Sequence, residues 1–340
     1  MTSLAFAGAG WITAILGMAA DAVPEMSVVH VASRRGLSAS RRAEQTGAVV
    51  CRYDQLPGGA DAVVVATPPP LHRREAERAV ESGALALVET PLAATLDDAD
   101  ALVTLAADRG LVAYGENLLH SPVVAQAVSA CRRIGSLTFL EVRLAQGVPD
   151  WGQDRTEPSW GGGALFDLGV HGVAVALLMA APARVVAVES ATVRPGERLA
   201  VDDDASVVLR FDTGLRSEVR ASWRAPAPAW DAQAASATGA VRLELVPEPS
   251  VEINGTGLRL PAPPTEATAP QLHHLGYIGL LEAAAADVEA GRTAPSTTVL
   301  GRLVLEILCA AYDSARTGEA TPLPYAGPRD RTPHEIWQDG

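Results

Sequence analysis

A glycine run followed by an aspartate and a histidine is the part of this sequence best suited to acid–base chemistry. Asp167 and His171 stand four positions apart after the glycines at 161–163. Residues at that spacing share one face of a helix, and one helix is predicted over about 164–180. Imidazole has an unperturbed pKa of about 6.5, so His171 can give or take a proton near neutral pH while Asp167 orients it or binds a substrate hydroxyl. The glycines predict a flexible entry that suits a loop closing over a substrate. The alternative is a pair that only caps a helix or links two domains.

Three further side chains are candidates for contact with a substrate. His120 follows a predicted strand at 112–114, and ligands of open parallel sheets collect at the carboxyl ends of the strands. Trp151 and Trp160 flank a Gly/Asp-rich loop before the predicted helix, where indole rings can stack on a sugar or an aromatic ring. The alternative role for each is packing, or for His120 a turn between domains.

A second constellation is the glycine loop near the start of the chain. Gly8 and Gly10 follow a predicted strand and open a predicted helix. Two glycines let the backbone turn tightly and approach a pyrophosphate, which then rests on the helix N-terminus. The loop continues through Trp11 and Ile12, and Thr13 stands where the pattern has a third glycine.

The end of the second predicted strand indicates which dinucleotide is bound. An acidic residue at this place would hold the ribose of NAD, but the sequence has Ser33, Arg34 and Arg35. A hydroxyl and two guanidinium groups suit a 2′-phosphate, so NADP is predicted, with NAD possible. Solvation at the surface is the alternative role for either arginine.

The first third of the chain predicts a dinucleotide-binding fold. Strands and helices alternate over residues 1–120, and the strands are continuous apolar runs such as Ala-Val-Val-Val-Ala at 62–66. Such runs are typical of parallel strands that are buried on both faces. The sequence therefore predicts an α/β protein whose domain at 1–120 is a Rossmann doubly wound parallel sheet.

The remaining residues, 121–340, predict a second domain of α+β type. Strands with alternating polar and apolar residues, joined by glycine-containing turns, indicate a large, mainly antiparallel open sheet. Predicted helices over 271–289 and 297–316 close the chain, and the final helix and tail can pack back on the first domain.

The composition narrows the range of partners. A net charge of −13 over 340 residues argues against nucleic acid and against an anionic membrane surface. The three cysteines are far apart and have no metal-binding spacing, so no metal site is predicted and a cytoplasmic location is expected. The longest apolar helical run, 172–183, is too short to span a bilayer.

These pieces, in this order and spacing, resemble the Gfo/Idh/MocA family of oxidoreductases. The matching segments are Gly8–Ile12, Ala66-Thr67-Pro68 with His72, Glu89-x-Pro91, the glycine run with Asp167 and His171, and Gly327–Pro333. The resemblance implies a Rossmann domain followed by a domain with a large open sheet that binds substrate and often forms oligomers, here a dimer or tetramer. It also implies NAD(P)-dependent oxidation or reduction of a sugar, a polyol or a related hydroxyl or carbonyl compound.

The resemblance also implies roles for individual residues. Besides the glycine loop and residues 33–35, the implied cofactor-binding residues are Ala66, Thr67, Pro68, His72, Glu89, Pro91 and Asn117. For His72 a structural role is favoured over that of an acid. Family members carry a lysine between the glutamate and the proline, and it touches both the cofactor and the reacting oxygen. In this chain that residue is Thr90.

The loss of this lysine is not offset elsewhere, because all 27 basic residues of the chain are arginines. A guanidinium does not release its proton at working pH, and the Thr90 hydroxyl can donate a hydrogen bond but is too weak an acid to supply a proton. The matching aspartate and histidine of the family contact substrate hydroxyls and help to move the proton. His171 with Asp167 is therefore expected to handle the proton in this chain.

Three hypotheses follow. The chain is an NADP-dependent oxidoreductase in which His171 has replaced the lysine. Alternatively it is a nucleotide-binding protein that no longer turns over a substrate, or a non-redox enzyme, such as an isomerase, lyase or cyclase, on the same fold.

Overall fold

The computed structural model describes residues 1–150, 153–264, 268–292 and 296–339. The chain divides into two compact units, Met1–Asn117 with Pro263–Arg302 and Leu118–Ala262 with Leu303–Gly340. Each unit contains one sheet, and helix α10, Ser296–Thr317, contributes residues to both units.

The first unit is built on a six-stranded parallel sheet in the order β3-β2-β1-β4-β5-β6. The strands of this sheet are β1 Thr2–Ala7, β2 Met26–Ala32, β3 Val49–Cys51, β4 Ala62–Val65, β5 Leu85–Val88 and β6 Val112–Tyr114. The central strands β4 and β5 are buried at every residue, as their continuous apolar sequences predict. The α/β fold with an initial parallel Rossmann sheet is confirmed.

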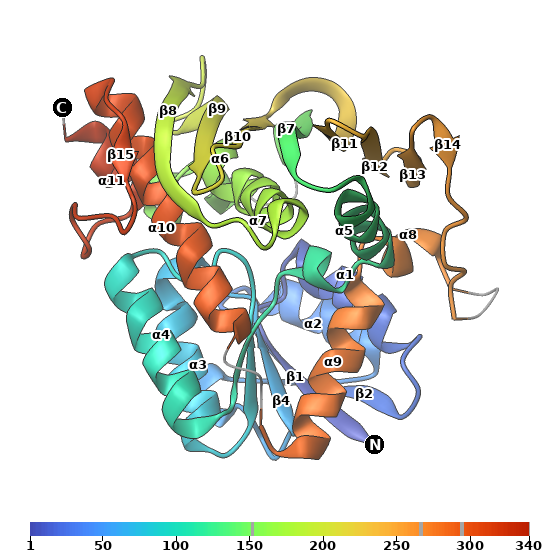
Figure 1. Cartoon of the computed structure of the whole chain (residues 1–340). Helices are drawn as coiled ribbons and strands as arrows, with labels where there is room; N and C mark the ends of the chain where they lie inside the picture. The colour runs from blue at the N-terminus through green and yellow to red at the C-terminus, as the bar shows by residue number, and fades with distance from the viewer. Residues whose placement is uncertain (151–152, 265–267, 293–295, 340) are drawn as a thin grey trace. The chain divides into compact units, whose positions relative to one another are not determined.

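Helices cover both faces of this sheet (Figure 1). They are α1 Trp11–Ala20, α2 Gly36–Thr46, α3 His72–Glu81, α4 Leu96–Arg109, α8 Pro270–His274 and α9 Tyr277–Ala290, with short 3-10 turns at Tyr53–Gln55, Pro69–Leu71 and Asn117–His120. Helices α3 and α4 pack together, and α1 packs against α2 and α9.

Residues 263–302, which were predicted to belong to the second domain, cluster with the first unit. Ile278 and Leu281 of α9 are fully buried in the same apolar core as Phe6 of β1 and Leu16 of α1. The burial of this apolar helix face explains why the segment returns to the first unit, and no local sequence pattern announces it.

The second unit contains a nine-stranded sheet in the order β14-β13-β12-β11-β7-β10-β9-β8-β15. The strands are β7 Leu137–Gly147, β8 Val185–Pro195, β9 Asp202–Phe211, β10 Arg216–Ser222, β11 Arg224–Ser236, β12 Gly239–Val246, β13 Ser250–Ile253, β14 Thr256–Gly257 and β15 Thr321–Pro322. Its pairs are antiparallel except for β7 and β10, which run parallel. The predicted large, mainly antiparallel sheet is confirmed.

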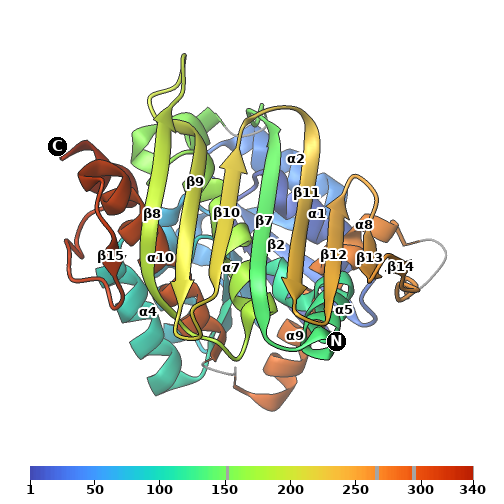
Figure 2. The same cartoon turned by 45° about the horizontal axis from the view of Figure 1, so that its top comes forward.

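One face of this sheet packs on helices of its own unit. Helix α5, Pro122–Ile134, lies on β11 to β13, and α7, Gly169–Ala180, lies on β7 and β10. In the part of the second unit that the structure describes, no helix lies on the opposite face of the long strands, as Figure 2 shows. The unit is completed by α6, Ala164–Asp167, and α11, Pro333–Gln338.

Two helices that the sequence predicts as continuous are broken. The helix predicted over 164–180 divides at Leu168, whose carbonyl accepts from the N–H groups of both His171 and Gly172 (3.1 Å each). The helix predicted over 271–289 divides at Gly276, whose φ of 84° is left-handed. Within the described ranges, no single helix is long and apolar enough to cross a membrane.

Candidate active site

The carboxyl edge of the six-stranded sheet collects the residues predicted to bind a dinucleotide. The main chain continues the ladder past the strand ends through four hydrogen bonds, each from an N–H to a carbonyl: Gly8 to Ala32 (2.8 Å), Ala66 to Ala7 (2.9 Å), Glu89 to Val65 (3.1 Å) and Gly115 to Val88 (2.6 Å). The turns after β1, β4, β5 and β6 are therefore aligned along one edge, where open α/β sheets bind their ligands.

The two loop glycines are needed for different reasons. Gly8 has a φ of +125°, and a Cβ on it would lie 2.3 Å from the Ala66 carbonyl oxygen. Gly10 is the N-cap of α1 and has no side-chain cap, and a Cβ on it would meet no described atom within 4 Å. Trp11 is 41% exposed, and Ile12 is half-buried. Open space before an uncapped helix N-terminus fits a dinucleotide pyrophosphate.

Thr13 is fully buried at the position of the third glycine. Its hydroxyl donates to the Gly10 carbonyl (2.9 Å) and accepts from Arg42 Nε (3.2 Å), and Arg42 Nη2 also donates to the Gly10 carbonyl (3.0 Å). Burial lowers the pKa of the Arg42 guanidinium, with the neighbouring Arg41 adding to the effect. Arg42 lies two turns into α2 and belongs to no motif, so the sequence alone does not predict its contact with the glycine loop.

The predicted 2′-phosphate residues follow β2. Arg34 and Arg35 are exposed, and the Ser33 hydroxyl accepts from the Arg35 N–H (3.2 Å). Burial raises the pKa of Tyr53, and Glu75 adds to the rise, whereas Arg34 and Arg74 act against it. Arg74 is paired with the buried Glu75 (2.7 Å), so the exposed Arg34 and Arg35 are the guanidinium groups that the end of β2 offers to a phosphate.

Thr90 differs from its neighbours in exposure. Every other residue of 84–94 is buried, whereas Thr90 is half-buried. Its N–H lies 3.3 Å from Glu89 Oε2, and its bond to Pro91 is cis. The residue in the place of the lysine thus reaches solvent from a segment that is otherwise fixed in the core.

His72 links the turn that follows β4 to the turn that follows β5. It is 1% exposed, with Nε2 2.8 Å from the Thr67 carbonyl oxygen and Nδ1 3.0 Å from the Pro91 carbonyl oxygen. Burial lowers the pKa of His72, and the carbonyl contacts oppose the shift. These contacts support the structural role favoured for this histidine. The buried Thr67 hydroxyl has no hydrogen-bond partner among the described residues, which leaves a polar group at this edge for a ligand.

Two buried polar residues lie at the end of β6 and just after it. Asn117 is buried and donates from Nδ2 to the Leu275 carbonyl (2.7 Å), so its amide ties the turn between α8 and α9 to this edge. Tyr114 is 1% exposed, and burial, followed by Glu116 and Glu89, raises its pKa well above the ordinary value. Tyr114 is therefore no acid for work near neutral pH.

The candidate catalytic pair lies in the second unit, on either side of the helix break. Asp167 is 9% exposed, and its carboxylate forms an ion pair with Arg155. The Arg155 Cζ atom lies 5.4 Å from the centre of the Trp160 ring. His171 stacks on Trp230, with ring centres 5.9 Å apart and planes inclined by 27°. An acid, an imidazole, a guanidinium and two indole rings are groups that can hold a sugar and move a proton. Arg155 and Trp230 were missed because neither belongs to a motif.

A buried carboxylate fixes the glycine run before this pair. Asp202 is fully buried and accepts from the N–H groups of Gly163 and Leu165 (2.9 Å each) and from the Tyr312 hydroxyl (2.6 Å). Burial raises the pKa of Asp202, and these donors act against the rise. A Cβ on Gly163 would lie 1.8 Å from the Asp202 carbonyl oxygen. Close packing thus accounts for Gly163, and the flexible entry that suits a closing loop stays a prediction.

The remaining candidates are placed as follows. His120 is half-buried at the end of the 3-10 turn Asn117–His120. Trp151 lies outside the described residues, so its contact with a substrate stays a prediction. Among the residues that the structure does describe, no group of three or more His, Cys, Asp and Glu side chains could hold a metal ion.

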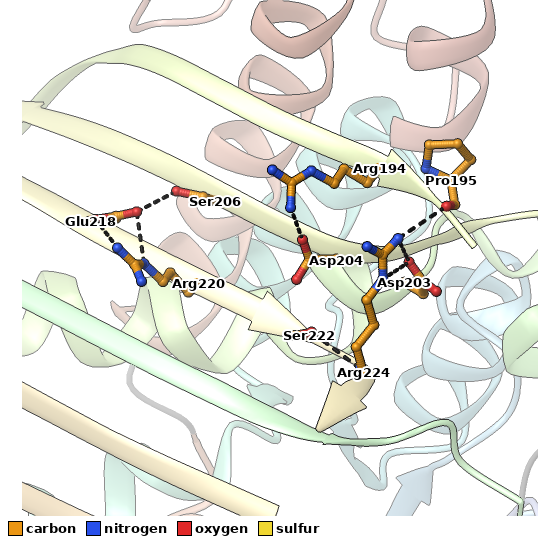
Figure 3. A network of polar contacts seen from close by, with 9 residues as sticks. All are labelled: Arg194, Pro195, Asp203, Asp204, Ser206, Glu218, Arg220, Ser222 and Arg224. Carbon is orange, nitrogen blue, oxygen red and sulfur yellow. Dashed lines mark hydrogen bonds and ion pairs between the residues drawn. The ribbon is translucent and has the colours of Figure 1, made fainter. Parts of the chain in front are cut away.

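The outer face of the nine-stranded sheet carries a second polar network (Figure 3). Glu218 accepts from Arg220 Nε (2.8 Å) and from the Ser206 hydroxyl (2.6 Å). On the neighbouring strands, Arg194 pairs with Asp204 (2.8 Å). These side chains line a shallow hollow of about 510 Å³. The outward positions of the central strands are thus occupied mainly by charges that are paired within the chain.

Two family profiles match this architecture. One, described as an oxidoreductase family with an NAD-binding Rossmann fold, matches residues 2–116, and the other, described as the GFO/IDH/MocA C-terminal domain, matches residues 124–259. The chain belongs to the Gfo/Idh/MocA family. It is therefore an NAD(P)-dependent oxidoreductase that acts on CH–OH or C=O groups.

Individual relatives agree with this assignment. The chain is 27% identical to D-xylose 1-dehydrogenase (NADP(+)) 2 of Haloferax volcanii, over 88% of this chain and 93% of that protein. It is 33% identical to a dTDP-3,4-didehydro-2,6-dideoxy-alpha-D-glucose 3-reductase of Streptomyces antibioticus, over 47% of this chain and half of that protein. GenD2 from gentamicin A biosynthesis, solved with NAD, is similar in structure, with a TM-score of 0.82, 25% identity, and coverage of 95% of this chain and 96% of that one.

Proposed function

We propose that this Gfo/Idh/MocA protein is an NADP-dependent sugar or polyol oxidoreductase in which His171, with Asp167, handles the proton. The single observation that supports it most is the environment of Thr90. The residues on either side of Thr90 are buried, and at the position of the family's lysine this chain offers only a hydroxyl. A nicotinamide, when bound, supplies or accepts the hydride at the sugar carbon. The proton must then come from another group of the chain.

The first unit would hold the dinucleotide through its backbone. Gly8 and Gly10 leave room for the pyrophosphate at the N-terminus of α1, and the orphan Thr67 hydroxyl supplies a hydrogen bond. Ser33, Arg34 and Arg35 would take the 2′-phosphate. The Haloferax relative is named for NADP, whereas GenD2 was solved with NAD, so the preference is tested directly. We expect tighter binding of NADPH than NADH by nucleotide fluorescence, and a loss of that difference in the double variant R34A/R35A.

The second unit would hold the sugar. Trp160 and Trp230 present indole faces beside Arg155 and His171, and Asp167 accepts from a sugar hydroxyl. In the reducing direction, the imidazolium of His171 gives its proton to the oxygen that gains charge; in the oxidising direction, the neutral ring removes the proton from the hydroxyl. Thr90 would bind the substrate oxygen through one hydrogen bond.

The proton assignment is tested with His171→Ala and Thr90→Lys. Wild-type protein is first assayed with NADP(H) and NAD(H) against a panel of aldoses, ketoses and polyols that includes D-xylose. We expect His171→Ala to lower kcat/KM by about 10²–10⁴-fold, the usual contribution of a positioned acid or base. Thr90→Lys should leave activity intact or raise it. Full activity of His171→Ala would remove the central residue of this proposal.

We also propose that the protein forms a dimer or tetramer through the outer face of the nine-stranded sheet. The support is the assembly typical of the family and the absence, among the described residues, of a second-unit helix over that face. Light scattering of the wild type and of Arg220→Glu tests this proposal, because a reversed charge facing its own copy should shift the mass toward the monomer.

A further inference from the structure

We propose that Arg155 stabilises the negative charge that develops on the reacting oxygen of a sugar held by the second unit. This inference rests on the proposed function, because it assigns a role within the same reaction. It concerns electrostatic stabilisation and leaves the proton to His171.

The starting point is the set of cations that this chain possesses. It has no lysine, so a fixed cation beside a substrate has to be one of its 27 arginines. Among the ion pairs of the described residues, the one that involves Asp167 is formed by Arg155. Arg155 thus contacts a residue whose family counterpart touches substrate hydroxyls.

The guanidinium is also held in a defined place. Asp167 binds one of its nitrogens, and the Trp160 ring lies 5.4 Å from Cζ. Only 23% of the Arg155 side chain is exposed. Because the charge is partly removed from water, its electrostatic effect on a nearby oxygen is stronger than it would be in solvent. A guanidinium has five N–H donors in a planar fork, and donors remain for a ligand after the contact with Asp167.

The chemistry then divides between two side chains. In the reducing direction, a reduced nicotinamide, when bound, would supply a hydride to the carbonyl carbon and become oxidised, and the electron pair of the C=O bond would move onto oxygen. That oxygen takes a proton from the His171 imidazolium and becomes a hydroxyl. A guanidinium does not release its proton at working pH, so Arg155 donates hydrogen bonds and no proton. It lowers the energy of the charge before the proton arrives.

The experiment compares Arg155→Gln, Arg155→Lys and the matched control Arg184→Gln, which breaks an exposed ion pair with Asp212 in the same unit. Each variant is assayed with the panel member that the wild type turns over fastest. We expect Arg155→Gln to lower kcat by about 10²-fold, the effect of removing one stabilising donor, with Arg155→Lys recovering most of it. The control should match the wild type.

Three readouts distinguish this role from a structural one. The pH dependence of kcat should keep its shape in Arg155→Gln, since arginine does not titrate in the working range. The affinity for the sugar in nucleotide-free protein, followed by tryptophan fluorescence, should change less than twofold. Guanidinium ion at low millimolar concentration should partly restore the activity of Arg155→Ala.

The possible failures can be told apart. If the wild type turns over no panel member and binds neither nucleotide, the proposed function fails and this inference falls with it. If the wild type is active and Arg155→Gln keeps its kcat, the inference alone is overturned. It is also overturned if Arg155→Gln loses sugar affinity and kcat in equal proportion, or if Arg155→Lys is as inactive as Arg155→Gln while circular dichroism shows both folded.

Discussion

The carboxyl edge of the six-stranded sheet and the polar cluster around Asp167 and Asp202 in the second unit are formed by different kinds of groups. The edge consists of backbone groups and glycines that lie close together in sequence, such as Gly8 and Gly10 beside the start of α1. The cluster consists of side chains from distant segments, such as Asp202 and Tyr312, which lie 110 positions apart. A binding site formed by backbone groups can therefore be predicted from a short sequence motif, whereas a site formed by side chains from distant segments depends on the completed fold.

The largest expected effect is on the backbone site. In Gly8→Ala, the new methyl group meets the Ala66 carbonyl oxygen at 2.3 Å, and the φ of +125° is unfavourable for alanine. We expect a loss of about 3 kcal/mol of stability and about 100-fold weaker NADPH binding, measured by chemical unfolding and by nucleotide fluorescence.

The matched control is Gly10→Ala, which places a methyl group in open space. It should retain the melting temperature of the wild type and yet weaken NADPH binding by about tenfold, since the methyl group takes room meant for a phosphate. Equal stability of both variants would show that the edge is not held by the contact between Gly8 and Ala66.

A middle-sized effect is expected in the second unit. Asp202→Asn removes a carboxylate that accepts from two N–H groups and the Tyr312 hydroxyl, and it turns an N–H₂ group toward at least one of these donors. The free energy of unfolding should fall by about 2–3 kcal/mol, and Tyr312→Phe should cost about 1 kcal/mol.

The effect of Asp202→Asn on kcat and on NADPH binding tests whether the sites of the two units are independent. It should lower kcat, because α6 carries Asp167, and leave the NADPH dissociation constant unchanged. A variant that instead lost nucleotide affinity while keeping kcat would contradict the separation of the two sites.

The smallest effect is a dependence on pH that both units share. Burial lowers the pKa of His72 in the first unit and of His334 in the second. The unfolded rings take a proton below a pKa of about 6.5, but the folded rings resist it. The stability present above that pH is therefore lost as pH falls from about 6.5 toward the folded values, by at most about 1.4 kcal/mol per pH unit for each ring.

Urea unfolding from pH 8 downward measures this slope, at roughly half-unit steps. His72→Gln and His334→Gln should each flatten it by one histidine's share. An unchanged slope in both variants would assign the acid lability to other groups.

The fold was largely predictable because its signals are local. Continuous apolar strands such as β4 and the glycine loop before α1 indicated the parallel sheet without any knowledge of tertiary contacts. The parallel pairing of β7 with β10 and the return of α9 to the first core were not predictable in this way. They depend on contacts between segments that are far apart in the chain.

The candidate site was predictable only where its residues belong to motifs. Asp167 and His171 stood out by their spacing, but the break at Leu168 places them in separate helices. Arg155, Arg42 and Asp202 gave no signal, because an arginine or aspartate in a polar stretch looks like any solvated residue. Their importance follows from what they touch: Asp167, Thr13 and the glycine run.

The contact between Thr13 and Arg42 makes two distant positions depend on each other. Returning glycine to position 13 would restore the common form of the loop, but it would deprive a guanidinium that is 8% exposed of one oxygen partner. Substitutions at positions 13 and 42 are therefore expected to have non-additive effects on stability. The order in which such a pair of mutations is introduced decides whether the intermediate protein is stable.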